Sequence, residues 1–158
     1  MNFIIIPIFF VFAFSNGQFN NYIIDWNKYV IKNNLDASAR RIIFLNGIEK
    51  YTNLTDINLK SNKINNLFYL KTLKNLNILD LSNNRIKILN HIENLTSLTK
   101  LDLSLNQIEI IDSISNLKNL QFLSLQQNNI KNVDCLFNLT KLAQLNLYSN
   151  RIFGFMMK

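Results

Sequence analysis

The stretch LNILDLSNNRIKILNHIENLTS, residues 76–97, is one copy of a 22-residue unit that recurs almost five times between residues 54 and 155. In every copy Leu or Ile stands at the fourth and sixth positions, Asn at the ninth and Ile at the eleventh. The copies begin at Leu54, Leu76, Leu98, Leu120 and Leu142. The invariant Asn of the five copies is Asn62, Asn84, Asn106, Asn128 and Asn150.

This spacing predicts one short strand per unit. Residues two apart in a strand, such as Leu79 and Leu81, point to the same face, whereas Asp80 between them points to the other. Each unit then adds one parallel strand about 4.8 Å from the last, so that the sheet grows by stacking. The Asn follows the strand, where its amide can satisfy buried turn backbone, and the stacked amides form a ladder. The second half of each unit returns along the convex side as an irregular or 3₁₀-like segment.

The pattern L-x-x-L-x-L-x-x-N-x-I at this period resembles the leucine-rich repeat. The resemblance implies an α/β solenoid, right-handed and curved, with a parallel sheet on the concave face. Residues 47–64, GIEKYTNLTDINLKSNKI, look like the repeat class named for the Sds22 regulatory subunit of protein phosphatase 1, and are also similar to internalin repeats. That class implies docking on a phosphatase through acidic and aromatic concave residues, which here are Asp80, Asp102 and Phe122.

Residues 1–17 have the features of a secretory signal peptide. The apolar run from Phe3 to Phe14 is shorter than the roughly 20 residues of a membrane span, and small residues follow it. No Lys or Arg precedes the run, so an uncleaved anchor and a mis-assigned start or buried apolar tail remain as alternatives. We predict a cleaved signal and no stable membrane span.

Residues 18–53 are predicted to form an N-terminal cap and a degenerate first repeat. Apolar residues recur at helical spacing from Phe19 to about Lys32, and an amphipathic helix that packs Trp26 over the first strand would cover the exposed core. A membrane-surface helix is the alternative. Residues 33–53 keep the phase of the repeat, although Ala37 and Arg40 replace the expected Leu and Asn.

Residues 54–158 are the repeat region, and its fifth unit stops early. FGFMMK follows Ile152, and no polar capping element comes after it. We expect either a truncated end or an apolar end that another molecule covers, with self-association as one outcome.

Composition argues against several functions. The net charge is +7, but the basic residues are scattered, which does not favour specific nucleic-acid binding. One His, one Cys and three isolated glycines provide no catalytic constellation, metal site or phosphate-binding loop, so we expect no enzyme and no cofactor. Asp80 and Asp102 share a column on adjacent strands. They are interpreted as part of a mixed-charge face with Lys100 as countercharge, as a recognition patch, or as an acid–base or metal pair.

The concave face is the predicted working surface, because it presents side chains in register. Phe122 and Tyr148 are the first candidates, since exposed aromatics are enriched at binding hot spots. The full predicted set is Asp56, Asn58, Lys60, Ile78, Asp80, Lys100, Asp102, Phe122, Ser124, Gln144, Asn146 and Tyr148.

The predicted function is a non-catalytic interaction module that binds a protein partner and is secreted or surface-displayed. Three N-x-T sequons, at Asn53, Asn94 and Asn138, would be glycan acceptors on a eukaryotic secretory route. The single Cys excludes intrachain disulfide-bonded caps. An intracellular regulatory scaffold of the Sds22 kind, in the cytoplasm or nucleus, is the alternative.

Overall fold

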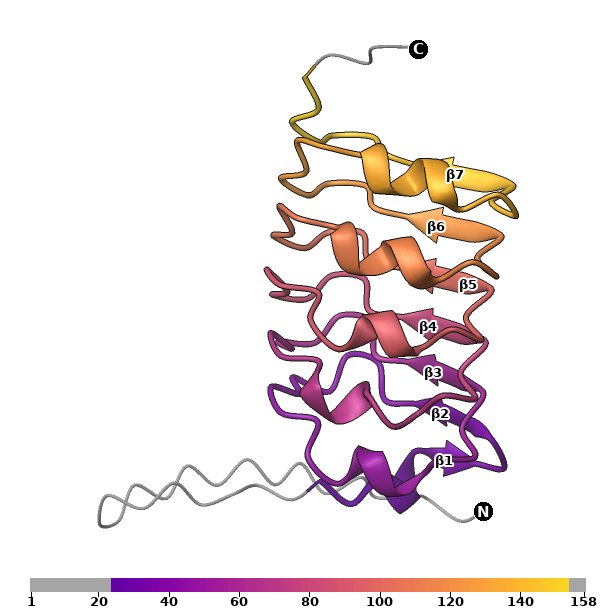
Figure 1. Ribbon diagram of the computed structural model, residues 1–158. Coiled ribbons are helices and arrows are strands. Elements are labelled where there is room, and N and C mark those ends of the chain that lie inside the picture. The colour runs from indigo at the N-terminus through magenta and orange to yellow at the C-terminus, as the bar shows by residue number, and fades with distance from the viewer. Residues whose placement is uncertain (1–23, 154–158) are drawn as a thin grey trace, which may run out of the picture.

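The computed structural model describes residues 24–153, which form a stack of rungs around one sheet (Figure 1). The strands follow one another in chain order across the sheet. They are Val30–Ile31 (β1), Asn34–Asp36 (β2), Asp56–Asn58 (β3), Ile78–Asp80 (β4), Lys100–Asp102 (β5), Phe122–Ser124 (β6) and Gln144–Asn146 (β7). Strands β2 to β7 are parallel, as predicted, and β1 pairs antiparallel with β2.

Short 3₁₀ turns form a second stacked layer (Figure 1). Apart from η1 at the N-terminal end, each lies in the second half of a unit, which confirms the predicted 3₁₀-like return segment. The turns are Trp26–Lys28 (η1), Ile48–Lys50 (η2), Phe68–Leu70 (η3), Ile92–Asn94 (η4), Asp112–Asn116 (η5) and Asp134–Asn138 (η6). No helix among residues 24–153 is long and apolar enough to cross a membrane.

The register pairs equivalent residues of successive units. Leu79 faces Ile57 on one side and Leu101 on the other, because each unit adds 22 residues. The backbone ladder continues past the strand ends, since the Leu81 N–H donates to the Asp102 carbonyl at 2.8 Å. Each rung therefore contacts its two neighbours in the same way, as expected of a solenoid.

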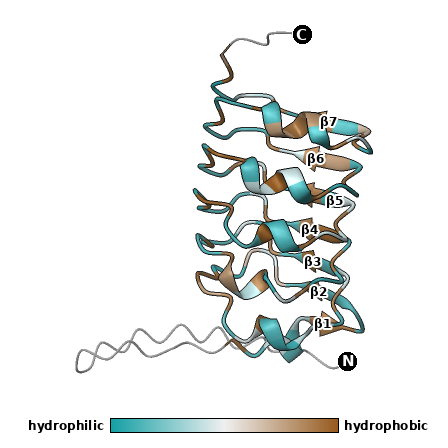
Figure 2. Cartoon of the chain, in the orientation of Figure 1, coloured by the Kyte–Doolittle hydropathy of each residue, from teal (hydrophilic) through white to brown (hydrophobic). Residues whose placement is uncertain are grey.

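One apolar core runs the length of the stack between the sheet and the 3₁₀ layer. Leu79, Leu101 and Leu123 from the sheet and Ile114 from the opposite layer are fully buried. Hydrophobic residues recur in every rung along the stack (Figure 2). Burial of these side chains stabilises the fold by roughly 1.5–3 kcal/mol each, relative to exposure.

The repeated Asn ties each turn to the preceding one. Asn84 Oδ1 accepts from the Ile64 N–H at 2.9 Å, while its Nδ2 donates to the Leu59 and Leu81 carbonyls at 3.0 Å each. Equivalent bonds are made by Asn62, Asn106, Asn128 and Asn150. The ladder satisfies turn backbone that the stacked rungs remove from water.

The residue before each ladder Asn adopts a left-handed backbone conformation. Its φ lies between 54° and 58° at Ser61, Asn83, Leu105, Gln127 and Ser149. Most L-residues disfavour this region, whereas Asn and Gly tolerate it. Leu105 is the least suited of the five, and its side chain is also 44% exposed.

Replacing Leu105 with Asn, the residue that stands at 83, is expected to raise the free energy of unfolding by about 1 kcal/mol. The gain comes from a lower cost of the left-handed backbone, and urea unfolding followed by circular dichroism measures it. Leu105→Ala is the matched control, because it removes the exposed side chain but keeps a Cβ at positive φ. Equal stabilities of the Asn and Ala variants would contradict the backbone explanation.

The N-terminal end differs from the predicted cap. Trp26 is buried in the same core as Leu35, but the helical part is a single turn, η1. The prediction of helix up to about Lys32 is wrong over Val30–Ile31, which forms β1. Pairing β1 with β2 satisfies backbone groups that an edge strand would otherwise expose. The earlier part of the predicted helix and the predicted signal at residues 1–17 lie outside the described residues.

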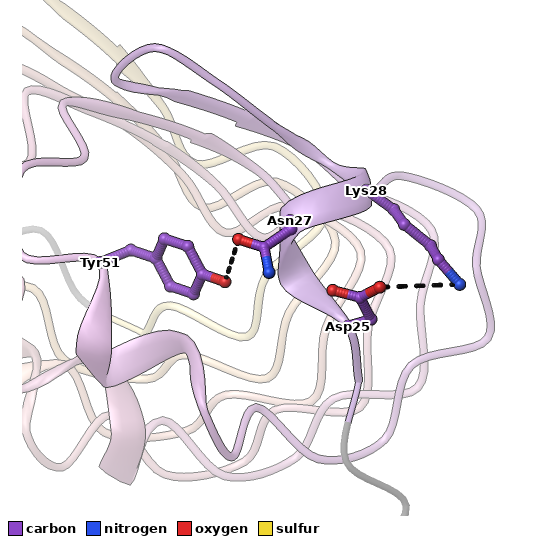
Figure 3. A network of polar contacts seen from close by, with 4 residues as sticks. All are labelled: Asp25, Asn27, Lys28 and Tyr51. Carbon is purple, nitrogen blue, oxygen red and sulfur yellow. Dashed lines mark hydrogen bonds and ion pairs between the residues drawn. The ribbon is translucent and has the colours of Figure 1, made fainter.

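Polar contacts hold this first turn in place (Figure 3). The Tyr51 hydroxyl, which follows η2, donates to Asn27 Oδ1 at 2.9 Å. Lys28 Nζ lies 3.8 Å from Asp25 Oδ2 on the surface. Exposed ion pairs of this kind stabilise little, so the buried Trp26 is the main anchor of the turn.

The last described rung is more exposed than the others. Leu145 on β7 is 44% exposed, whereas the equivalent Leu123 on β6 is fully buried. Residues 154–158 lie outside the described part of the chain. The predicted self-association through this end remains a prediction.

Candidate binding groove

The strand register aligns the outward side chains in two rows across the sheet. The first row contains Asn34, Asp56, Ile78, Lys100, Phe122 and Gln144. The second row contains Asp36, Asn58, Asp80, Asp102, Ser124 and Asn146. A shallow groove of about 380 Å³ runs over them from β2 to β6. Its lining includes Asn34, Asp36, Asp56, Asn58, Ile78, Asp80, Lys100, Asp102 and Phe122. We call it the concave groove.

The concave groove has the opposite charge to the chain as a whole. Asp36, Asp56, Asp80 and Asp102 line it together with one cation, Lys100, which gives a net charge of −3. The chain carries 10 acidic and 17 basic residues and has a net charge of +7. Within the described part of the chain, four acidic residues but only one basic residue therefore line this groove.

Asp80 and Asp102 are held by the turns that follow their strands. Asp80 Oδ1 accepts from the Ser82 backbone N–H at 2.9 Å and from its hydroxyl at 2.6 Å. Asp102 makes the same two bonds with Ser104. Asp36 Oδ1 likewise accepts from the Ser38 N–H at 3.0 Å.

The same turn does not require a charge. Asn58 Oδ1 accepts from the Lys60 N–H at 3.1 Å, and Asn146 Oδ1 accepts from the Tyr148 N–H at 3.0 Å. An amide and a carboxylate thus serve equally as acceptor in this position. The negative charge at residues 80 and 102 is additional to the needs of the fold.

Asp36 on the first rung lies in the same row as Asp80 and Asp102, and we call these three residues the acidic row. The backbone N–H and hydroxyl of Ser38 hold the pKa of the Asp36 carboxyl below its usual value. The charge of Arg40 acts in the same direction. Asp36 is therefore ionised at neutral pH.

Lys100 does not pair with the acidic row, contrary to the sequence-based expectation of a countercharge. Its ammonium lies 5.2 Å from the centre of the Phe122 ring. The contact is a cation–π interaction between neighbouring strands. Within residues 24–153 neither Asp80 nor Asp102 forms an ion pair, and each has one carboxylate oxygen without a hydrogen bond.

Two apolar side chains complete the groove. Ile78 on β4 is 38% exposed, and Phe122 on β6 is half-buried beside Lys100. They flank the rung that carries Lys100 and Asp102. Apolar side chains next to fixed charges are typical of protein-binding surfaces.

The other predicted concave residues lie outside this groove. Lys60 and Tyr148 are exposed beyond the strand ends, and Gln144 and Asn146 lie on β7. Ser124 belongs to the second row but is buried, with 5% exposure, because its short side chain lies between Asp102 and Asn146 on the neighbouring strands.

Sequence reasoning missed Asn34 and Asp36, which line the first rung of the groove. Their unit is degenerate, so it was predicted as an irregular rung. The signal was nevertheless available, since Asn34 and Asp36 stand 22 residues before Asp56 and Asn58 and pair with them.

Cys135 and His91 lie away from the groove. Burial raises the pKa of the Cys135 thiol to about 11, and the charge of Asp112 adds to this effect. The thiol is therefore protonated at neutral pH and poorly nucleophilic. His91 directly precedes η4 and packs against Phe68, with ring centres 5.3 Å apart. No group of three His, Cys, Asp or Glu among residues 24–153 could hold a metal ion.

The three sequon asparagines are exposed. Asn94 and Asn138 end the turns η4 and η6, and Asn53 lies just before β3. None of the three side chains forms a hydrogen bond with another described residue. Each is therefore accessible for modification.

Comparison with solved structures identifies the class of protein. Internalin C2 of Listeria monocytogenes matches over 77% of this chain and 54% of its own, with 34% identity and a TM-score of 0.76. The ectodomain of the receptor kinase SOBIR1 from Arabidopsis thaliana matches over 75% of this chain and 69% of its own, with 24% identity and a TM-score of 0.64. The plant peptide hormone receptor RGFR1, solved in complex with RGF2, matches over 68% of this chain and 19% of its own, with 32% identity and a TM-score of 0.62.

The fold and these neighbours define a solenoid with a parallel sheet on its concave face. The chain is a leucine-rich repeat protein. It spans about half the length of internalin C2 and of internalin F from Listeria monocytogenes. Neither protein-family models nor curated proteins give a match to the sequence. Assignment to the Sds22-like subclass stays a prediction.

Proposed function

We propose that this chain is a non-catalytic interaction module that binds a protein partner in the concave groove and acts outside the cell. The observation that carries the proposal is the groove itself. It joins the outward side chains of five rungs and contains apolar Ile78 and Phe122 next to carboxylates without ion-pair partners. The fold offers a long surface with side chains in register, and such surfaces are where solenoid proteins bind their partners.

Comparison with other leucine-rich repeat proteins supports a protein partner. RGFR1, which is 32% identical over the matched part, was solved in complex with RGF2 as a peptide hormone receptor. Two further neighbours are an internalin and a receptor ectodomain. We infer by analogy that the present chain binds a protein or peptide.

The binding test compares partner recovery by wild type and two variants from extracts and medium of the native host. Phe122→Ala is expected to reduce recovery of a specific partner at least about tenfold, because truncation of an aromatic anchor in an interface is among the costliest changes. Ile110→Ala is the control, since Ile110 is 70% exposed away from the sheet. Equal recovery by all three proteins would overturn binding in the concave groove.

The proposed location outside the cell is tested by intact-mass measurement and N-terminal sequencing of the protein from its host. We expect loss of about the first 17 residues, as sequence features of a signal peptide suggest. Glycan mass on Asn53, Asn94 or Asn138 would add support for the secretory route. An intact Met1 in a cell extract would contradict export, and recovery of a phosphatase with that protein would favour the regulatory-scaffold alternative.

A further inference from the structure

We propose that the concave groove binds an extended, basic segment of its partner, with Lys or Arg side chains over the acidic row and an apolar side chain at Phe122. The inference rests on the proposed function and names the chemistry of the partner. Its basis is charge complementarity on a sheet face that no other part of residues 24–153 covers.

The charge of the groove selects for a cationic partner. The chain is basic overall, yet the groove has a net charge of −3. A basic segment gains attraction along β2 to β5, where Asp36, Asp56, Asp80 and Asp102 follow one another on successive strands. An acidic segment would meet the same groups and be repelled.

The second feature is the apolar end of the groove. Phe122 on β6 lies beside Lys100, whose ammonium covers part of the ring. Phe122 offers apolar contact area at the end opposite to Asp36, and Ile78 on the middle strand β4 adds an apolar contact between Asp56 and Lys100. The partner segment is therefore expected to carry basic side chains along β2 to β5 and a large apolar side chain at β6.

The dimensions fit a short extended chain. Neighbouring strands are about 4.8 Å apart, so the four steps from β2 to β6 cover about 19 Å. An extended segment rises about 3.3 Å per residue, so about six residues fill this length. Arg is the better cation for this surface, because its guanidinium forms paired hydrogen bonds with carboxylates.

The turns provide variants that remove charge and keep the fold. The residues equivalent to Asp80 on β3 and β7 are Asn58 and Asn146, and each accepts the same backbone hydrogen bond. The double variant Asp80→Asn/Asp102→Asn therefore keeps the turn acceptors and removes two charges. We expect its melting temperature to stay equal or to rise at low salt, because two like charges on adjacent strands repel.

The experiment selects ligands from a random octapeptide library with the full chain, and then measures individual peptides by fluorescence anisotropy. The proposal expects enriched peptides with a net positive charge and at least one large apolar residue. Binding to Asp80→Asn/Asp102→Asn should be at least about tenfold weaker, and salt should weaken binding to wild type. Asp112→Asn/Asp134→Asn changes the net charge equally on η5 and η6, and should bind like wild type.

The outcomes separate the two proposals. Neutral or acidic peptides, or equal binding to wild type and Asp80→Asn/Asp102→Asn, would overturn the basic-segment assignment. If Phe122→Ala still abolished binding in that case, the groove itself would remain the binding surface. Peptides that bind regardless of all these variants, or no enriched peptide, would overturn the groove as a site for an extended segment. If the double variant failed to fold, the single variants Asp80→Asn and Asp56→Asn would be compared in the same way.

Discussion

Asn106→Ala is expected to lower the free energy of unfolding by about 2–4 kcal/mol, because it removes hydrogen bonds of the buried ladder and leaves one buried backbone N–H without a partner. Asn106 Oδ1 accepts from the Ile86 N–H at 3.0 Å. Its Nδ2 donates to the Leu81 and Leu103 carbonyls at 3.0 and 3.1 Å. Asn106 is 8% exposed, so alanine would leave the Ile86 N–H without a partner where water has little access, while the Leu81 and Leu103 carbonyls would keep only their bonds from Asn84 and Asn128.

Asn150→Ala is the matched control for this measurement. Asn150 makes the same contacts, with the Ile130 N–H at 3.1 Å and the Leu125 carbonyl at 2.8 Å, but it is only half-buried. Water can replace these bonds, so we expect a loss of less than about 2 kcal/mol. Urea unfolding of both variants, followed by circular dichroism, gives the comparison. Similar losses at Asn106 and Asn150 would show that burial does not determine the strength of the ladder.

Trp26→Ala is expected to cost about 3–5 kcal/mol, typical of the loss of a large buried aromatic side chain. Trp26 is 2% exposed at the N-terminal end of the core. Its Nε1 donates to the Asn46 carbonyl at 3.0 Å, and its ring packs edge-on to Tyr29 with centres 6.4 Å apart. Removal would open the end of the core that Trp26 covers.

Trp26→Phe separates packing from hydrogen bonding. Phe fills much of the indole volume but cannot donate to Asn46, so we expect a loss of about 1–2 kcal/mol. Both variants are compared by urea unfolding. Near-equal losses for Ala and Phe would mean that the hydrogen bond, and not the packing, closes this end of the core. Negligible losses for both would contradict an anchoring role.

Gly47 lies next to the indole of Trp26. Gly47 has a φ of 91°, and a Cβ placed on it would lie 3.4 Å from two atoms of the indole. Glycine therefore avoids an unfavourable backbone conformation, whereas a Cβ would meet the ring only at ordinary contact distance. The sequence shows an isolated glycine at this place, but its contact with Trp26 becomes visible only in the structure.

Most of the rung geometry could be predicted from sequence. The apolar columns that include Leu79 and Leu101 predicted a stack of parallel strands in a register of 22 residues, which the structure confirms. The placement of Asn before the returning segment predicted a turn, and the structure adds the bond partners. This works because each rung packs only on its neighbours, so a local pattern determines most of the contacts.

The N-terminal end of the solenoid and the details of the groove were harder to predict from the sequence. Helical spacing around Trp26 predicted a helix, but Val30–Ile31 pairs with β2, because an edge strand needs partners that periodicity does not reveal. Asp80 and Asp102 could be placed in one column, whereas their turn bonds and the position of Lys100 over Phe122 could not.

The sequence by itself determined the solenoid, its strand register and the residues of its core, because a 22-residue period places equivalent side chains side by side in every rung. Only the tertiary structure decided which outward residues form a groove and which charges stay unpaired. Those properties depend on side-chain rotamers and on neighbours 22 or 44 residues away in the chain. The identity of these neighbours differs from one repeat to the next.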